Sequence, residues 1–356
     1  MTYLNLFANC QIVKGAGMSV ICDLQMRRYY HIPNDMAEII TFLKESPIET
    51  CYEKYGQSNK DVIDSYVNFI TKNELGFFDS SIYKELSALD LSWDSYSPIT
   101  NIIIEYDPSI NYEVAFLQDL INLNIDALEV RCYDVVSYGQ IGAFLNLFEK
   151  STILSIRLIL KYHKGINKRY LEKLIDNHLR VNAVQIHGAP VDDVSMIFDD
   201  TVSLQFSKHK ISSCHQCGNI HPGYFTSSLK LFSESQHHNT CLNRKLSIDR
   251  TGFIRNCPSL PEHFGHIANA KLNDLLGKPS FKKLWNIKKD DIEVCKDCEF
   301  RHVCTDCRAY VEDPGDLYSK PLKCGYNPYT NEWTDWFLDK TKEKGIYHYQ
   351  LEKLAP

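Results

Sequence analysis

The sequence predicts an α/β protein made of three successive domains and a C-terminal tail. Residues 1–80 open with strand-type runs and continue with three helical patterns, which predicts a winged-helix-like unit. Residues 99–210 alternate short β-branched runs with helical patterns, which predicts a partial (β/α) barrel. Residues 211–330 hold nine of the thirteen cysteines, which predicts a metal-binding domain, and residues 331–356 are expected to form a tail.

The composition is that of an ordinary globular protein. The chain has 356 residues, of which 44% are hydrophobic and 24% charged, and its formal net charge is −6. An acidic chain without a basic domain disfavours nucleic-acid binding. No stretch approaches the ~18 apolar residues of a membrane span, and the first residues lack a signal-peptide pattern. We therefore expect a cytoplasmic protein that binds neither nucleic acid nor membrane.

The N-terminal unit is predicted to combine a small sheet with three helices. Strands are expected over residues 4–14 and 19–26, and Gly15-Ala16-Gly17 between them is typical of a hairpin. The other expected elements are a strand at Arg28–Ile32, a helix opened by Pro33-Asn34, a helix at Ile48–Tyr55, a helix from Ser58 to near Asn73 with Asp61 in a capping box, and a strand at Leu75–Phe78. A plain structural subdomain or a DNA-binding winged helix fits the same layout, although the acidic charge weighs against DNA.

Residues 79–98 are expected to form a linker, and strands alternating with helices follow it. The candidate strands are Asn101–Tyr106, Ala127–Cys132, Thr152–Leu160, Asn182–His187 and Val202–Phe206, and the candidate helices are Tyr112–Leu123, Tyr138–Glu149 and Lys168–His178. This fits a partial barrel better than a full one, which typically needs ~250 residues. Near the strand ends, packing is the expected role of His187, and both packing and a place at the barrel mouth stay open for Arg131 and Asp134.

The C-terminal third is loop-rich. A β-hairpin is expected where Lys245–Asp249 and Phe253–Asn256 flank Arg250-Thr251-Gly252, and short helices are expected at Ala270–Leu276 and Ser280–Trp285. No long apolar run follows. A segment of this kind cannot bury enough surface to fold alone, so we expect a bound metal to supply the missing stability.

The cysteines are spaced as in metal sites. The series consists of Cys214-x2-Cys217, Cys241-x15-Cys257, the compact run Cys295-x2-Cys298-x5-Cys304-x2-Cys307, and Cys324. Thiolates are strong soft ligands, and a Cys-x2-Cys turn lets two sulfurs reach one metal. Because thiols stay reduced in the cytosol, metal binding is favoured over disulfides. The scattered Cys10, Cys22, Cys51 and Cys132 are expected to be buried core residues.

A partial barrel followed by this series resembles a radical-SAM protein with a SPASM domain, over roughly residues 99–330. The matching positions are Cys241, Gly252, Cys257, Cys295, Cys298, Cys304, Cys307 and Cys324; the Cys304–Cys307 spacing is one residue shorter than the family more often has. The resemblance implies two [4Fe–4S] clusters, one held by Cys295, Cys298, Cys304 and Cys324, and one by Cys241, Cys257, Cys307 and an upstream residue. Cys217 is the preferred fourth ligand, with Cys214, His237 or His238 as alternatives. Zinc is the alternative metal.

The barrel departs from that family at its catalytic loop. Radical-SAM enzymes hold their catalytic cluster with Cys-x3-Cys-x2-Cys after the first barrel strand, whereas here that loop is Asp107-Pro108-Ser109-Ile110-Asn111. No Cys-x3-Cys occurs anywhere in the sequence. We therefore expect a degenerate barrel that does not use S-adenosylmethionine, and we assign no catalytic residue.

Three further segments resemble the SPASM-domain peptide maturases of grasp-with-spasm systems: Ser233–His238, Cys241–Asp249 and Asn256–Ser259. Members of that group are encoded with an ATP-grasp ligase and a small precursor peptide, and several lack the radical-SAM triad. The layout of residues 1–80 likewise resembles the RiPP recognition element of peptide-modifying enzymes, where a precursor peptide adds a strand to a sheet edge. The resemblance implies a maturation protein that binds a ribosomal precursor peptide and acts with an ATP-grasp ligase.

Two other functions stay open. The chain could be an iron–sulfur enzyme that modifies a peptide by redox or radical chemistry at an auxiliary cluster. It could instead be a zinc-binding interaction protein outside peptide maturation, since four-cysteine sites accept either metal.

Overall fold

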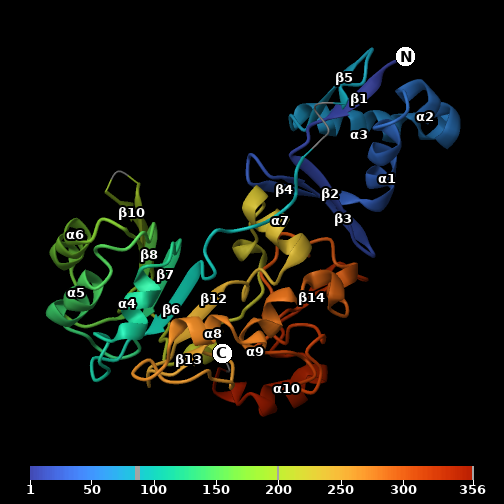
Figure 1. Cartoon of the computed structure of the whole chain (residues 1–356). Coiled ribbons are helices and arrows are strands. Elements are labelled where there is room, and N and C mark those ends of the chain that lie inside the picture. The colour runs from blue at the N-terminus through green and yellow to red at the C-terminus, as the bar shows by residue number, and fades with distance from the viewer. Residues whose placement is uncertain (85–88, 199, 355–356) are drawn as a thin grey trace. The chain divides into compact units, whose positions relative to one another are not determined.

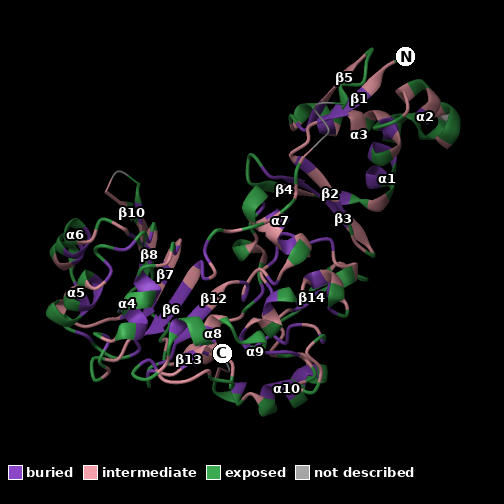
Figure 2. Ribbon diagram, viewed as in Figure 1, coloured by how far each residue is buried: buried purple, intermediate pink, exposed green. Residues whose placement is uncertain are grey.

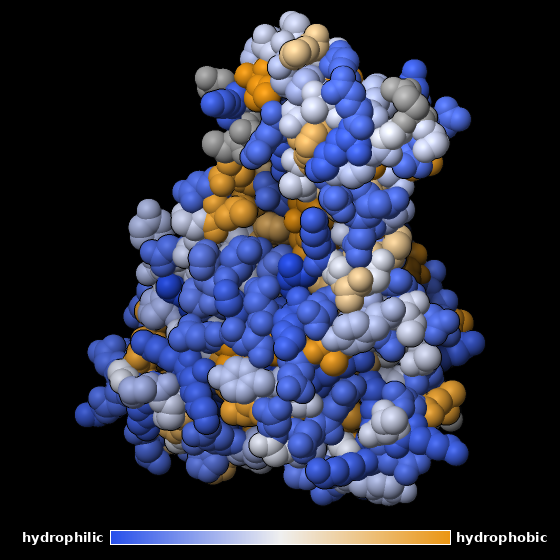
Figure 3. Space-filling model, turned by 90° about the vertical axis from the view of Figure 1, so that its right-hand side faces the viewer, coloured by the Kyte–Doolittle hydropathy of each residue, from blue (hydrophilic) through white to orange (hydrophobic). Residues whose placement is uncertain are grey.

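The computed structural model describes residues 1–84, 89–198 and 200–354, and the chain forms two compact units (Figure 1). Unit 1 comprises Met1–Asp94, Asn219–Thr240 and Asn286–Pro356, and unit 2 comprises Ser95–Gly218 and Cys241–Trp285. The domain boundaries expected from the sequence stay predictions. No helix in the described residues is both long and apolar enough to cross a membrane, and the face drawn in Figure 3 is mainly hydrophilic with scattered hydrophobic patches.

The N-terminal part of unit 1 contains two small antiparallel sheets. Strand β1 (Tyr3–Leu6) pairs with β5 (Gly76–Asp79), while β2 (Cys10–Lys14), β3 (Met18–Asp23) and β4 (Arg28–Pro33) form a sheet in that order. The single strand expected over residues 4–14 is therefore wrong. A turn closed by the hydrogen bond from the Cys10 N–H to the Phe7 carbonyl (2.9 Å) divides it, so its two halves join different sheets. The hairpin at Gly15–Gly17 is confirmed.

Three helices cover one face of the β2–β3–β4 sheet. They are α1 (Asn34–Leu43), α2 (Ile48–Tyr55) and α3 (Lys60–Lys72). Helix α1 turns Met36, Ile40 and Leu43 into a core shared with Ile21 and Ile32 of the sheet, because residues at helical spacing fall on one face. The expected capping box at the start of α3 is wrong: a 3-10 turn occupies the preceding residues, and no side chain caps the helix.

Unit 2 is built on an eight-stranded sheet in which most neighbours are parallel. Its order is β10 (Asp193–Ile197), β11 (Val202–Ser207), β9 (Val181–His187), β8 (Ser155–Lys161), β7 (Ala127–Arg131), β6 (Asn101–Glu105), β12 (Lys245–Ile248) and β13 (Ile254–Arg255). The α/β class, the five expected barrel strands and the hairpin at β12–β13 are confirmed. Strand β10, an antiparallel edge strand, was not expected.

The two faces of this sheet differ in polarity. Helices α4 (Ala115–Ile121), α5 (Tyr138–Asn146) and α6 (Lys168–Asn177) share a core with the alternate residues Ile102, Ile104, Leu128, Val130 and Leu158 (Figure 2). The intervening residues point to the other face, because side chains alternate along a strand. They include Glu105, Glu129, Arg131, Arg157 and Lys245, so this face is strongly charged.

The remaining elements are short. Unit 2 adds α8 (Leu272–Leu276) and α9 (Pro279–Lys282), and unit 1 adds α7 (Leu229–His237), β14 (Tyr326–Asn327), β15 (Glu332–Trp333) and α10 (Glu343–His348). Residues 331–354 contribute β15, α10 and the buried Leu351.

The second face of the β2–β3–β4 sheet packs against the cysteine-rich segment of unit 1. Val13, Val20 and Tyr29 of the sheet lie in one hydrophobic cluster with Phe300 and Tyr326. The N–H groups of the β2–β3 turn add hydrogen bonds, from Ala16 to the Asp297 carbonyl (2.8 Å) and from Gly17 to the Pro328 carbonyl (3.0 Å). This sheet is consequently held between its own helices and the cysteine-rich segment.

Candidate metal centres

Four of the predicted ligands lie together in unit 1, and we call Cys295, Cys298, Cys304 and Cys324 the Cys295 site. A 3-10 turn at Cys295–Asp297 brings the first two close, closed by the hydrogen bond from the Cys298 N–H to the Cys295 carbonyl (3.0 Å). Cys295 and Cys304 are buried, and Cys298 and Cys324 are partly buried. Each of the four thiols interacts electrostatically with at least one of the others.

The environment of the Cys295 site disfavours thiolates in the absence of a metal. Burial, the largest cause, raises the pKa of Cys295 to about 11 and that of Cys304 to about 12, and it also raises the pKa of Cys298. A bound metal supplies the positive charge that reverses this balance and deprotonates coordinating thiols. The donor set therefore fits a metal that binds several thiolates, such as an iron–sulfur cluster or zinc.

A buried lysine accompanies the Cys295 site. Lys289 is 4% exposed, and its Nζ lies 4.0 Å from the Cys295 sulfur and 3.4 Å from Oδ1 of Asp306. Burial acts to lower the Lys289 pKa, but Cys295, Cys304 and Asp306 together raise it well above its ordinary value. Asp306 is itself buried and also accepts hydrogen bonds from Arg308 (2.8 Å) and Asn239 (2.6 Å). A fixed cation thus stands beside the thiols.

Three further predicted ligands lie together in unit 2, and we call Cys217, Cys241 and Cys257 the Cys241 site. All three raise the pKa of Lys245, against the lowering effect of its burial. The Lys245 ammonium lies 3.4 Å from the Cys241 sulfur, and an Arg131 guanidinium nitrogen lies 3.9 Å from the Cys217 sulfur. The Cys241 site therefore also has cations beside its thiols.

The predicted place of Cys307 in the Cys241 site, and the choice of Cys217 over Cys214, His237 and His238, stay predictions. Cys307 belongs to unit 1, as do His237 and His238, whereas Cys214 belongs to unit 2. Cys214 lies near Arg131 as Cys217 does, and burial, the largest cause, raises its pKa. Its backbone carbonyl accepts a hydrogen bond from the Ser259 hydroxyl (3.2 Å).

No disulfide joins any of the thirteen cysteines, all of which lie in the described ranges. Cys10, Cys22, Cys51 and Cys132 are buried, as expected of core residues. Within the part of the chain that the structure describes, no group of three or more His, Cys, Asp or Glu side chains has the geometry to hold a metal ion as placed. The two sites are consequently assigned from their donor sets and neighbouring charges, and their ligands stay predictions.

The loop that follows β6 holds salt bridges where radical-SAM enzymes hold cysteines. Arg250 lies 3.4 Å from Asp107 and 2.9 Å from Asp134. Behind them, Glu105 is buried and accepts a hydrogen bond from the Tyr133 hydroxyl (2.5 Å), and burial, the largest cause, raises the Glu105 pKa. This end of the sheet is thus occupied by a charged network.

Sequence reasoning placed His187 correctly and missed three charges that are buried or partly buried. His187 is fully buried, its Nε2–H donates to the Cys132 carbonyl (3.0 Å), and its Nδ1 accepts from the Ile211 N–H (3.2 Å). It is a satisfied core residue, as expected. The roles of Lys289, Lys245 and Glu105 were missed. The one available signal was their position: Lys289 lies six residues before Cys295, Lys245 four after Cys241, and Glu105 one residue before the end of a predicted strand.

The fold and the donor sets define an α/β protein with two groups of clustered thiols. No protein-family model and no curated protein matches the chain. Among solved structures, SuiB of Streptococcus suis, bound to S-adenosylmethionine, is similar with a TM-score of 0.30 and 8% sequence identity, over 90% of this chain and 99% of that chain. At that TM-score the similarity carries no argument about this protein.

Proposed function

We propose that this chain is a maturation protein for a ribosomally made peptide and that it binds the precursor at the edge of β4. The observation that carries this proposal is the position of β4, which pairs with β3 on one side and is an edge strand among the described residues. A sheet edge presents a row of backbone N–H and C=O groups, to which an extended peptide can add as a further strand.

A cavity beside β4 supports peptide binding there. It has a volume of about 540 Å³ and is lined by Arg28 and Tyr30 of β4 and by Thr71 and Asn73 at the end of α3, among others. Tyr30 also packs edge-on against Phe69 of α3 (5.7 Å between ring centres). Since alternate side chains of an added strand point to opposite sides, this cavity offers space for the side chains on one side.

The two cysteine sites act in this proposal as structural metal centres that hold the peptide-handling domain together. The loop after β6 has no cysteine, so the chain does not cleave S-adenosylmethionine by the usual radical-SAM route. Modification of the peptide is then the task of a partner, which we propose to be an ATP-grasp ligase encoded with the precursor.

The test is binding of the full-length protein to a fluorescent synthetic copy of the small precursor peptide encoded beside its gene. Thr71→Trp, at an exposed position that lines the cavity, fills the site and should weaken binding at least about tenfold. Ser65→Trp, on an exposed position of the same helix outside the cavity lining, is the matched control and should bind normally. Absence of binding by the wild-type protein, or equal binding by both variants, would refute the proposal.

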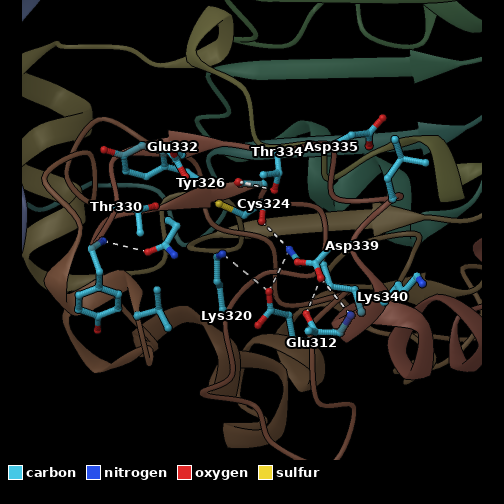
Figure 4. A pocket seen from close by; sticks show the side chains of 17 residues that line it. Glu312, Lys320, Cys324, Tyr326, Thr330, Glu332, Thr334, Asp335, Asp339 and Lys340 are labelled. Atoms are coloured by element: carbon cyan, nitrogen blue, oxygen red, sulfur yellow. Dashed lines mark hydrogen bonds and ion pairs between the residues drawn. The ribbon is translucent and has the colours of Figure 1, made fainter.

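A redox enzyme is the second candidate, favoured by one observation. Cys324 of the Cys295 site lines a pocket of about 940 Å³ together with Lys320, Glu312 and Asp339 (Figure 4). A substrate in this pocket would lie beside the metal centre. Anaerobically reconstituted protein that forms 5′-deoxyadenosine from S-adenosylmethionine and a reductant would support this function, and no product at verified cluster content would count against it.

A further inference from the structure

Glu299 occupies an unusual position between the β2–β3–β4 sheet and the Cys295 site. Its side chain is 0% exposed, and its Oε1 lies 2.8 Å from Nε2 of His31 and accepts a hydrogen bond from the Tyr326 hydroxyl. The other oxygen, Oε2, is buried without a hydrogen-bond partner among the described residues. A buried carboxylate that is only half satisfied is costly, so its retention calls for a physical explanation.

Glu299 connects strand β4 with the Cys295 site. His31 belongs to β4, the strand proposed to bind the peptide. Glu299 directly follows Cys298, and its other partner, Tyr326, lies two residues after Cys324, so both residues lie next to predicted ligands of the Cys295 site. One carboxylate therefore connects the peptide-binding strand to two of the four thiol segments.

The packing around this carboxylate leaves little freedom. The His31 ring stacks on Phe300, with 5.4 Å between ring centres and 29° between ring planes. A Cβ added at Gly15 in the β2–β3 turn would lie 2.8 Å from Glu299 Oε2 and 2.7 Å from the Glu299 backbone nitrogen. Because the turn and β4 both contact Glu299, a displacement of Glu299 must move the sheet or break these contacts.

We infer that Glu299 is a positioning residue that couples the Cys295 site to β4, so that metal binding at the site sets the position of the peptide-binding edge. This inference rests on the proposed function and adds regulation to it. Metal binding at the Cys295 site holds the segments around Cys298 and Cys324 in place. Through its contact with Glu299, His31 in β4 is then held in place as well. By linkage, precursor binding at β4 strengthens metal binding by the same factor as metal strengthens precursor binding.

Amide hydrogen exchange of the full-length protein, with metal bound and after chelation, tests the coupling directly. Glu299→Gln and His31→Ala should each speed exchange of the β4 amides about tenfold in the metal-loaded protein and leave β7 and β8 of unit 2 unchanged. The same variants should change β4 exchange little after chelation, because the order that they transmit is already lost. Glu332→Gln, the same chemical change at an exposed position, is the control and should have no effect.

Two results would overturn the inference. One is unchanged β4 exchange in both variants with metal bound; the other is an equal effect with and without metal, which is what a purely structural contact produces. If Glu299→Gln does not fold, His31→Ala carries the test, because the His31 side chain is 39% exposed.

Peptide affinity separates this inference from the proposed function. Coupling predicts that chelation and Glu299→Gln each weaken precursor binding about tenfold. Binding that is equally strong in all these forms would refute the coupling and retain the proposed function. Failure of the wild-type protein to bind the precursor, together with metal-dependent β4 exchange that requires Glu299, would refute the proposed function and retain the coupling.

Discussion

The two cysteine sites differ in whether all of their predicted ligands belong to one unit of the chain. All four predicted ligands of the Cys295 site belong to unit 1, two of them are buried, and the neighbouring Lys289 is 4% exposed. The Cys241 site takes three predicted ligands from unit 2, of which Cys217 is exposed, and its predicted Cys307 belongs to unit 1.

This difference follows from sequence spacing. Cys295, Cys298 and Cys304 lie within ten residues, so one short turn and its continuation bring them together. Cys217 and Cys257 lie 40 positions apart in the sequence, and β12 and β13 must pair before Cys241 and Cys257 approach each other. A compact site depends on local turns, whereas a dispersed site depends on the tertiary fold, and the two should respond differently to mutation.

Loss of a ligand from the Cys295 site should have the largest effect. Metal binding contributes about 10 kcal/mol or more to the folding of small metal-dependent domains, so Cys298→Ala should remove one metal site and unfold the cysteine-rich part of unit 1. Iron, sulfide and zinc analysis of anaerobically purified protein measures the first effect and identifies the metal; hydrogen exchange measures the second.

Cys132→Ala provides the matched control for this prediction. Cys132 is a buried thiol of unit 2 that contributes only packing, so its replacement should retain full metal content and cost about 1 kcal/mol. If Cys298→Ala keeps the metal content of the wild type, Cys298 is not a ligand and the assignment of the Cys295 site is wrong.

Replacing the lysine beside each site should also destabilise the Cys295 site more than the Cys241 site, but by less than the loss of a ligand does. Lys289→Met removes a buried charge from Asp306 and Cys295, and breaking a buried ion pair costs about 3–5 kcal/mol. Lys245→Met acts at a partly exposed side chain, where solvent screens the interaction, and should cost about 1 kcal/mol. Chemical denaturation of the metal-loaded variants compares them. Equal losses would show that burial of the cation does not distinguish the sites.

The sequence was sufficient to predict the parallel strands of unit 2, but not its exposed edge strand β10 or every strand boundary in the chain. Runs such as Ile102–Ile104 and Ile156–Leu160 are rich in β-branched residues, so their strands are expected whatever surrounds them. The break between β1 and β2 was missed although Ala8 and Asn9 disfavour strands, and the pairing of β1 with β5 reveals it. Strand β10 was missed because its residues are largely exposed and its one partner is β11.

The sequence predicts the candidate metal sites only to the extent that the spacing of their cysteines determines them. The cysteines can be recognised from the sequence because few other functions place thiols at such intervals. Lys289, Lys245 and Glu299 give no such signal, because lysine and glutamate are ordinarily surface residues and nothing in the sequence tells which of them are buried or partly buried. Their places depend on contacts between segments far apart in the chain, such as that of His31 with Glu299.

The smallest expected effect concerns unit 2 alone and arises from His187. Burial, the largest cause, lowers the pKa of this histidine from 6.5, and its two backbone hydrogen bonds require the neutral ring with the proton on Nε2. The unfolded chain takes up a proton near pH 6.5, whereas the folded chain resists it. The stabilising contribution is therefore fully present above pH 6.5 and is lost as the pH falls below 6.5 toward the folded-state pKa.

Replacing His187 with Gln should flatten this part of the pH dependence. The wild-type protein should lose more stability than His187→Gln between pH 7.5 and 5.5, because its unfolded chain takes up the His187 proton more readily than its folded chain. Hydrogen exchange of β9, which carries His187, measures the difference within unit 2. Parallel pH profiles for the two proteins would show that folding does not lower the pKa of His187, contrary to its burial. Because His187 lies in unit 2, the exchange of unit 1 amides should be the same in both proteins, which separates this acid sensitivity from any change at the Cys295 site.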